Sequence, residues 1–188
     1  YAQEVWARNA VANSAARWKI AMAHHPYASN GTHGNAGDFE ADMFGGSASS
    51  PCRLSSIALE DAPGGTSSCG KRYQAFLENT ICDADTPANQ VDLFLEGHDH
   101  ELQWLKPQAN CGKAQFLLSS AAAKTRELAN RTRNPAYYQE DEILGFVRIH
   151  IRGSTLEGTM YKVDPASGAL SVIYRQICEQ GNPNCLVL

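Results

Sequence analysis

The sequence predicts an α/β protein in which layered, mixed β-sheets are flanked by helices. Short apolar runs of the length of buried strands alternate with segments of helical periodicity. A stretch of strict apolar–polar alternation near the carboxyl end is typical of an antiparallel meander. The chain has 188 residues, of which 43% are hydrophobic, so it is long enough for one domain with a substantial core.

The first part of the chain contains a helix, a strand and a long irregular segment. Residues 1–17 lack internal Gly and Pro and can form one apolar helix face. The short apolar run 18–23 ends at His24-His25-Pro26 and predicts a buried strand. Residues 27–70 are rich in Gly, Ser, Asn and Asp, which predicts an irregular segment. Helical periodicity returns over residues 71–82.

The second part of the chain is predicted to be mostly β-structure. The apolar runs 91–95 and 115–119 predict two further strands, and a polar stretch follows at 124–142. Residues 145–177 alternate between apolar and polar side chains and are divided by two Gly-containing turns, which predicts a three-stranded meander. Because helix and strand alternate before the meander, the elements are expected to form layers around a sheet.

Charge and hydropathy exclude two classes of partner. Sixteen Lys and Arg residues against 20 Asp and Glu residues give a net charge of −4, and no basic run stands out. We therefore expect no nucleic-acid partner. The longest apolar stretches are far shorter than the roughly 20 residues of a spanning helix, so we expect no membrane span.

The six cysteines favour disulfides and an oxidising compartment. None of them forms a C-x-x-C pair, and their even number suits three disulfides in a secreted, extracellular or periplasmic protein. The alternative is a cytosolic protein with six reduced thiols. Six cysteines allow about 15 connectivities, so the pairing is a guess. A strong turn signal lies between the last two cysteines. The pairs we expect are Cys178–Cys185, Cys52–Cys69 and Cys82–Cys111.

Histidines form the main candidate functional feature. Five of the six histidines lie in two short segments, each beginning directly after a predicted strand. Chemistry in layered α/β folds sits beyond the carboxyl ends of the strands, so the two segments are expected to meet at one sheet edge. Imidazole nitrogens are common ligands of zinc, iron and manganese. In an extended segment His98 and His100 would face one side, with Asp99 turned away. The alternative is a set of solvated loop histidines.

These segments also resemble a known family. Trp18-Lys19-Ile20-Ala21-Met22-Ala23-His24-His25-Pro26, followed by Gly31-Thr32-His33-Gly34, resembles the fourth signature block of calcineurin-like metallophosphoesterases. The segment 91–105, with Gly97-His98-Asp99-His100-Glu101-Leu102-Gln103-Trp104-Leu105, resembles the fifth block. The likeness is greatest to the purple, or tartrate-resistant, acid phosphatase branch. It covers most of the chain and leaves about 35–70 as an unmatched insertion.

The resemblance implies a fold and a set of roles. Residues 1–188 would be the carboxyl-terminal part of a metallophosphoesterase domain, the second half of a four-layer α/β/β/α sandwich. His24 and His98 would ligate one metal ion and His100 the other. His33 would be the catalytic residue that contacts phosphate or protonates the leaving group, whereas His25 occupies a position that varies in the family and is not expected to be a ligand. The cofactors would be two divalent or trivalent ions of Fe, Zn or Mn, and the substrate a phosphate ester.

The acidic signature blocks of this family, D-x-H, G-D-x-x-D and G-N-H-[DE], have no counterpart in the chain. Two neighbouring cations repel each other strongly and need anionic ligands, which three histidines do not supply. We do not expect Asp92 or Asp99 to serve as ligands. The missing carboxylates are expected from the N-terminal half of the same protein, which is thus a predicted partner. The alternative function is a noncatalytic secreted metal-binding or structural protein related to the family.

Three arginines follow the third predicted strand in a loop that could approach the histidines. Arg126, Arg131 and Arg133 could meet a substrate phosphate there. A solvated loop is the alternative that we favour from the sequence.

Overall fold

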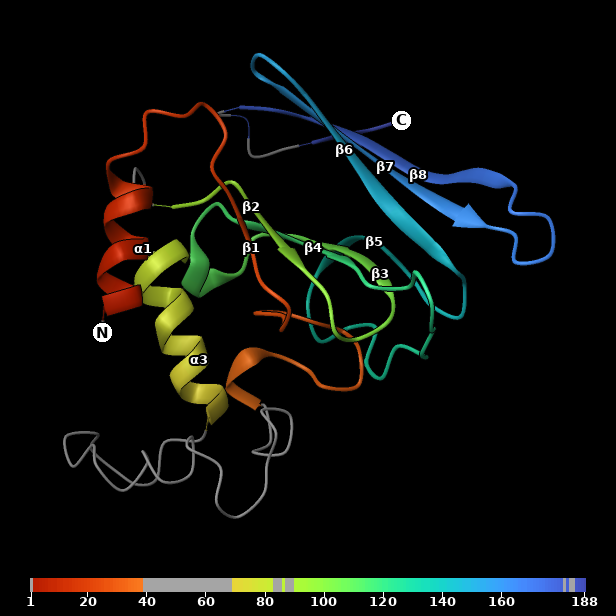
Figure 1. Ribbon diagram of the computed structural model, residues 1–188, viewed down its shortest axis with the longest axis horizontal. Coiled ribbons are helices and arrows are strands. Elements are labelled where there is room, and N and C mark those ends of the chain that lie inside the picture. Colours follow the sequence, from red (N-terminus) through yellow and green to blue (C-terminus); the bar gives the residue numbers. More distant parts are fainter. Residues whose placement is uncertain (1, 39–68, 83–85, 87–89, 181, 183–184) are drawn as a thin grey trace.

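The computed structural model describes residues 2–38, 69–82, 86, 90–180, 182 and 185–188 (Figure 1). Their strands form one five-stranded and one four-stranded sheet, and helices lie along one side of the five-stranded sheet. The predicted α/β class, with layered sheets flanked by helices, is confirmed.

The five-stranded sheet is mixed, and its strand order is β1-β2-β4-β3-β5. The first three strands in this order run parallel, and the last two are each antiparallel to their neighbour. The strands are β1 (Ile20–Met22), β2 (Leu93–Glu96), β3 (Leu102–Leu105), β4 (Gln115–Ser119) and β5 (Ala136–Glu140). The predicted strands at 18–23, 91–95 and 115–119 are therefore the three parallel strands.

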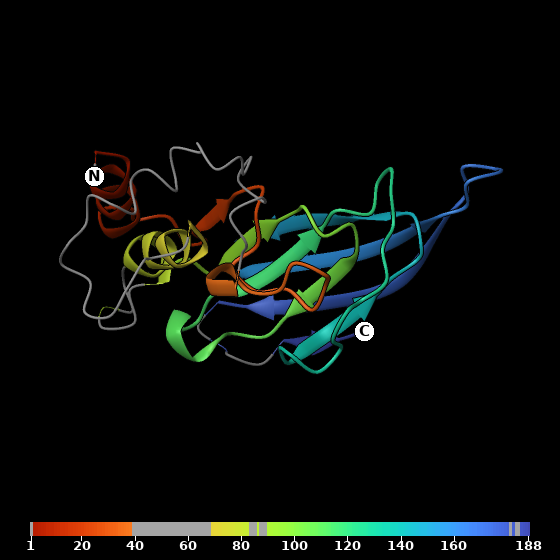
Figure 2. The same cartoon turned by 90° about the horizontal axis from the view of Figure 1, so that it is seen from below.

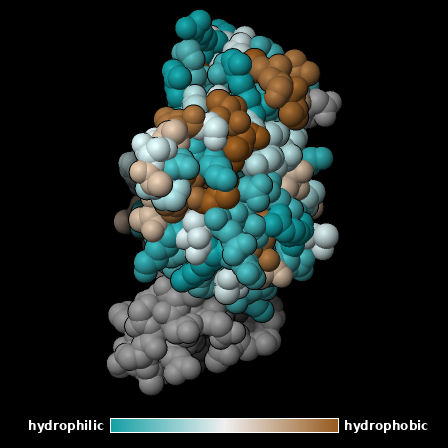
Figure 3. Space-filling view, turned by 90° about the vertical axis from the view of Figure 1, so that its right-hand side faces the viewer, coloured by the Kyte–Doolittle hydropathy of each residue, from teal (hydrophilic) through white to brown (hydrophobic). Residues whose placement is uncertain are grey.

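The four-stranded sheet is antiparallel throughout and has the order β6-β7-β8-β9. Its strands are β6 (Gly145–Arg152), β7 (Thr155–Val163), β8 (Leu170–Glu179) and β9 (Leu186–Val187). The first three are the predicted meander. Many apolar side chains on these strands are exposed, and Figure 3 shows apolar atoms gathered over the upper part of one face of the molecule, where this sheet lies.

The helices are short. They are α1 (Ala2–Ala12), α3 (Cys69–Leu77) and the helical turns η1 (Ala36–Asp38), η4 (Glu78–Cys82, π-helical) and η6 (Ala109–Cys111). The predicted helix at 1–17 thus ends earlier, and the one predicted at 71–82 is split between α3 and η4. The described residues include no helix with the length and hydropathy that crossing a membrane requires.

Two apolar clusters define the layers, because neighbouring residues in a strand point to opposite faces. Phe94, Phe116 and Leu118 pack with residues of α3 and η4 on one face of the five-stranded sheet. Trp104 and Leu117 pack on the other face, against β6, β7 and β8. The described layers are therefore helices, mixed sheet and antiparallel sheet. Seen from below, the strands of the mixed sheet lie over those of the antiparallel sheet, and α1 and α3 lie to one side (Figure 2).

Two strands of the mixed sheet lie where the sequence did not predict them. β3 follows the second histidine segment, and β5 lies within the stretch 124–142, which the sequence marked only as polar. All four residues of β3 are buried, including Gln103, so this strand lacks the alternation that marks a one-sided strand. Pairing with β4 and β5 satisfies its backbone, which is a tertiary effect that overrides local propensity.

Two of the three expected disulfides are present. Cys82–Cys111 joins η4 to η6, and Cys178–Cys185 joins β8 to the segment before β9. The expected Cys52–Cys69 pair lies outside the described residues, since Cys52 is not among them. Most of the insertion expected at about 35–70 also lies outside them, so the domain boundaries of this chain remain a prediction.

Candidate metal centre

The two histidine segments meet at one edge of the mixed sheet, as predicted from the strand ends. β1 and β2 run parallel, with Met22 opposite Leu95, so the residues that follow each strand emerge side by side. The Gly97 amide donates to the carbonyl of His24 at 3.1 Å. A side chain at Gly97 would press on that carbonyl, which explains the glycine at this close backbone approach.

Three imidazoles form a cluster at this edge. One ring nitrogen from each of His24, His25 and His98 lies within 4.8 Å of the other two, which is a spacing that could hold a metal ion. His24 Nε2 and His98 Nδ1 are 3.0 Å apart. The described part of the chain therefore groups His25, which the resemblance did not make a ligand, with two of the expected ligands.

The backbone around His98 is not extended, contrary to our expectation. His98 and His100 have φ angles of 71° and 65°, in the left-handed region that non-glycine residues rarely adopt. Such conformations cost free energy and cluster at functional sites. Because of this turn, only His98 joins the three-imidazole cluster. His100 instead lines a separate cavity near residues 123–126.

His33 lies beside the cluster and is held by Asp99. The ring centroids of His33 and His98 are 4.4 Å apart. The Asp99 carboxylate is fully buried, and it accepts hydrogen bonds from His33 Nδ1 and from the Ser29 hydroxyl. Asp99 is thus turned away from the three imidazoles, as expected. Because a carboxylate accepts from Nδ1, the proton of a neutral His33 ring sits on Nδ1 and leaves Nε2 as an acceptor.

A buried polar network fixes the loop that carries His33. The loop residues Ser29 and Asn30 are completely buried, and the Asn30 amide donates to Gln103 of β3 at 2.8 Å. Arg133 Nη1 donates to the carbonyls of Ser29 and Gly31 at 2.7 and 2.8 Å. Although this loop was expected to be irregular, its described part is therefore held as firmly as a core segment.

Burial and neighbouring groups lower the pKa of His98 and of His100. Burial is the largest cause that lowers the pKa of His98 to about 4, followed by the neighbouring His33, His25 and His24. Burial, followed by Arg126 and Lys124, also lowers the pKa of His100. Metal ligation needs the unprotonated imidazole, so His98 and His100 are ready to ligate at neutral pH.

The nearby carboxyl groups of Glu96 and Glu101 have raised pKa values, and Glu96 accepts a backbone hydrogen bond. Burial raises the pKa of Glu96, and its Oε1 accepts from the Tyr27 amide at 2.6 Å. Burial, with the charge of Asp99, raises the pKa of Glu101 to about 8. Among the described residues, no carboxylate belongs to the group of ligand atoms formed by the three imidazoles.

A metal ion fits the donors that are present. His98 Nε2 and His100 Nδ1 are buried and have no hydrogen-bond partner among the described residues. A buried imidazole nitrogen whose lone pair accepts no hydrogen bond is suited to bind a cation. The donor set is three imidazole nitrogens, which suits one ion of the zinc or iron type. It does not compensate the charge of two adjacent cations.

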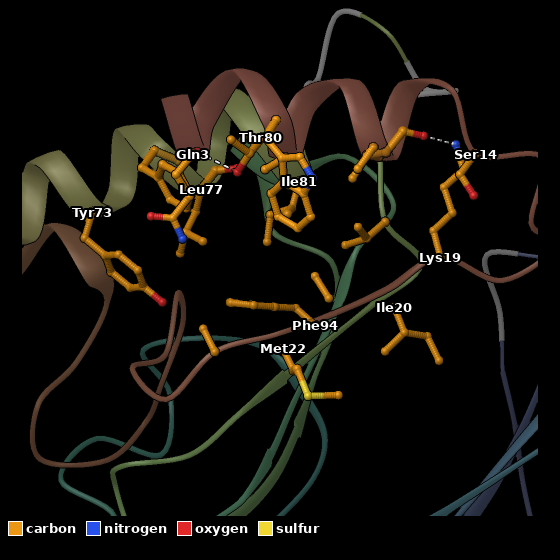
Figure 4. A pocket seen from close by; sticks show the side chains of 18 of the residues that line it. Gln3, Ser14, Lys19, Ile20, Met22, Tyr73, Leu77, Thr80, Ile81 and Phe94 are labelled. Carbon is orange, nitrogen blue, oxygen red and sulfur yellow. Dashed lines mark hydrogen bonds between the residues drawn. The ribbon is translucent and has the colours of Figure 1, made fainter. Parts of the chain in front are cut away.

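A second, apolar cavity lies under α1 on the outer side of β1. It has a volume of about 730 Å³, and Figure 4 shows Ile20, Met22, Phe94 and Leu77 around it. Met22 is 76% exposed although it belongs to a strand of the mixed sheet. In the described chain, β1 is the outermost strand on this side and hydrogen-bonds only to β2.

Comparisons with known proteins add little beyond this geometry. No protein-family model matches the chain, and no curated protein does. Among solved structures it is similar to Vps29 of Entamoeba histolytica. A single mutant is 21% identical over 47% of this chain and 41% of that one, with a TM-score of 0.31. The wild-type protein complexed with Zn²⁺ is 20% identical over 48% and 41%, with a TM-score of 0.30. The match thus spans about two fifths of the Vps29 chain, and at these scores we derive no role from it.

Proposed function

We propose that this chain is part of an enzyme that hydrolyses phosphate esters with the help of metal ions. The observation that carries the proposal is the meeting of His24, His25 and His98 at the carboxyl ends of β1 and β2, with ring nitrogens within 4.8 Å of one another. The signature-block resemblance of these two segments to purple acid phosphatases supports phosphate esters as the substrate class. The reaction class is that of an acid phosphatase-like phosphomonoesterase.

The histidines divide into ligands and a substrate-facing group. His24 and His98 would hold one ion, and His100 contributes toward a second, as the resemblance implies. Bound ions at such a site supply Lewis-acid stabilisation of phosphate oxygens and acidify a water molecule. His33 lies next to His98 and is oriented by Asp99, so its Nε2 can contact the phosphate. When Nε2 also carries a proton, His33 can donate that proton to the leaving oxygen.

The acidic ligands would come from the N-terminal half of the same protein. The described imidazole cluster includes no carboxylate, so a second cation needs negative charge from elsewhere. β1 offers an outer edge, flanked by the apolar cavity under α1, on which a further parallel strand can pair. Residues that follow such a strand would emerge beside His24, where the carboxylates are needed.

Disulfides support a secreted location for the enzyme. Cys82–Cys111 and Cys178–Cys185 both have bonding geometry, and disulfides persist in oxidising compartments. We therefore place the protein outside the cytosol, in the extracellular space or the periplasm.

A noncatalytic metal-binding protein is the second candidate. The all-nitrogen donor set of the described residues favours it, since three imidazoles can hold a single ion without any reaction. A full-length protein that binds one ion per chain and hydrolyses neither phosphate monoesters nor diesters at any pH would establish this alternative.

The central prediction concerns His98. In the full-length protein, His98→Ala should remove bound metal, because it deletes one imidazole ligand of the cluster. It should also lower the rate of p-nitrophenyl phosphate hydrolysis by at least about 10³-fold. Metal content by elemental analysis gives a readout independent of turnover. His150→Ala is the matched control, because His150 lies on β6 of the other sheet and bonds only to Arg152 in the described chain. Wild-type turnover in His98→Ala would rule out this ligand assignment.

A further inference from the structure

A cavity of about 790 Å³ lies between the histidine edge of the mixed sheet and the antiparallel sheet. His100 forms one wall, and residues 123–126 and 142–144 line it from the loops around β5. Lys162, Val163 and Pro165 line it from the end of β7. The cavity therefore shares His100 with the proposed metal centre but is otherwise built by different segments.

The charge of this cavity is positive. Lys124, Arg126 and Lys162 line it, against one carboxylate, Glu142. The described residues form no ion pair with any of these three cations, whereas Arg131 pairs with Asp141 at 2.7 Å elsewhere. A concave surface lined by three cations and one carboxylate attracts anions, and most strongly those with more than one charge.

Backbone hydrogen bonds tie the segments that carry these cations to the walls of the cavity. The Arg126 amide donates to the carbonyl of His100 at 3.3 Å, which ties the 123–126 loop to the histidine edge. The Val163 amide donates to the Leu144 carbonyl at 2.8 Å, which ties the end of β7 to the opposite wall. Arg126 and Lys124 both lower the pKa of His100, in agreement with their position next to its ring.

The other arginines of this region have structural contacts. Arg131 is paired with Asp141, and Arg133 donates to the carbonyls of the His33 loop. Of the three arginines that the sequence placed in this loop, only Arg126 faces the cavity. Lys124 lies in the same loop as Arg126, whereas Lys162 comes from the end of β7, a segment that the sequence did not connect with the histidines.

We propose that this basic cavity binds a second phosphate group of the substrate while the reacting phosphate lies at the histidine cluster. The inference rests on the proposed function and narrows its substrate class to phosphate esters that carry a further phosphate, such as diphosphate esters. The shared wall at His100 places the cavity beside the reacting site, and its volume accommodates a phosphate group with its hydration shell. The three cations would recognise the second phosphate group by its charge rather than by its shape.

Inorganic pyrophosphate is the probe for this site. Its affinity is measured by calorimetry on the full-length protein at about 50 mM and about 200 mM salt. The variant that combines Lys124→Gln, Arg126→Gln and Lys162→Gln should bind at least about tenfold more weakly than wild type at the lower salt. Arg148→Gln is the matched control, because Arg148 is exposed on β6 and does not line the cavity. Thermal melting checks that each variant is folded.

A kinetic ratio provides the second measurement. The triple variant should lower the ratio of kcat/KM for adenosine diphosphate to kcat/KM for p-nitrophenyl phosphate by about tenfold, and Arg148→Gln should leave that ratio at the wild-type value. If the triple variant binds pyrophosphate within twofold of wild type, the cavity assignment is overturned.

The same binding test in a His98→Ala background separates this inference from the proposed function. If the wild-type protein binds pyrophosphate in a charge-dependent way but hydrolyses neither ester, the cavity assignment stands and the proposed phosphatase activity is contradicted. If the wild-type protein hydrolyses both esters and the triple variant loses no affinity for pyrophosphate, the proposed activity stands and the cavity assignment is overturned.

Discussion

At the scale of single residues, the site depends on two histidines in an unusual backbone conformation. His98 and His100 both have positive φ values, and the intervening Asp99 is fully buried and holds His33. The turn sends three consecutive side chains to three different places. These are the imidazole cluster, the buried network and the basic cavity.

The ligand role of His25 can be tested against that of His100. The geometry groups His25 with His24 and His98, so His25→Ala in the full-length protein should weaken metal affinity by more than about tenfold. Competition with a chromophoric chelator measures this affinity, with His150→Ala as the control. Unchanged affinity in His25→Ala, together with a loss in His100→Ala, would favour the ligand set implied by the family resemblance.

A pH dependence of stability is expected from Glu101. Its buried Oε2 accepts from Gln103 Nε2 at 3.1 Å, its Oε1 has no described partner, and its pKa is raised to about 8. Between the ordinary glutamate pKa and pH 8, the folded state keeps a proton that the unfolded state releases. Stability therefore falls as pH rises through this window, by up to about 1.4 kcal/mol per pH unit from this group.

Glu101→Gln should remove that dependence. Urea unfolding at pH 5.5 and 7.5 measures the difference in unfolding free energy for wild type and variant, and exposed Glu127→Gln serves as the control. Equal pH slopes for wild type and Glu101→Gln would show that Glu101 is ionised in the folded protein.

At the scale of elements, β3 and β7 come close together between the two sheets, at Trp104 and Gly158. Trp104 is fully buried, and its indole nitrogen donates to the Gln115 side chain at 2.7 Å. Gly158 of β7 lies directly against the Trp104 ring, so that a methyl group there would overlap it. Glycine at this point lets the antiparallel sheet approach the mixed sheet, which in turn positions the β7 end that lines the basic cavity.

Gly158→Ala should therefore destabilise the protein by roughly 1–3 kcal/mol through overpacking. Chemical denaturation measures the loss. Trp104→Leu makes room for the added methyl group, so the double variant should lose less than the sum of the two single losses. Additive losses would mean that the Trp104 ring does not oppose Gly158.

At the scale of the whole molecule, one disulfide joins two layers and the other lies within the antiparallel sheet. Cys82–Cys111 closes a separation of 29 residues, whereas Cys178–Cys185 closes one of 7. In the chain-entropy description, the longer loop gives the larger stabilisation, about 3.6 kcal/mol against about 2.4 kcal/mol. The first disulfide joins the helical layer to the segment before β4, so it also holds two layers together.

Removal of each disulfide should thus have unequal effects. Replacing Cys82 and Cys111 with Ser should lower the Tm more than replacing Cys178 and Cys185 with Ser, as differential scanning calorimetry would measure without reductant. A count of free thiols in the unfolded wild-type protein accompanies this test. Six reactive thiols would contradict both disulfides and return the protein to a reducing compartment.

Patterns in the sequence were enough to predict the fold class, the three parallel strands, the meander and the meeting of the histidine segments. These features depend on local information. Apolar periodicity marks strands such as 115–119, and the ends of parallel strands lie at one edge. Of the two expected disulfide pairs that are present, only Cys178–Cys185 had a sequence signal behind it, the turn between the two cysteines.

Only the tertiary structure decided which side chains share a space. It brought His25 into the imidazole cluster, joined His33 to Asp99 across 66 positions of sequence, and collected Lys124, Arg126 and Lys162 around one cavity. It also made strands of β3 and β5, whose own residues show no strand alternation. Contacts between distant segments depend on burial and on backbone turns such as the left-handed turn at His98. Sequence periodicity does not predict these features.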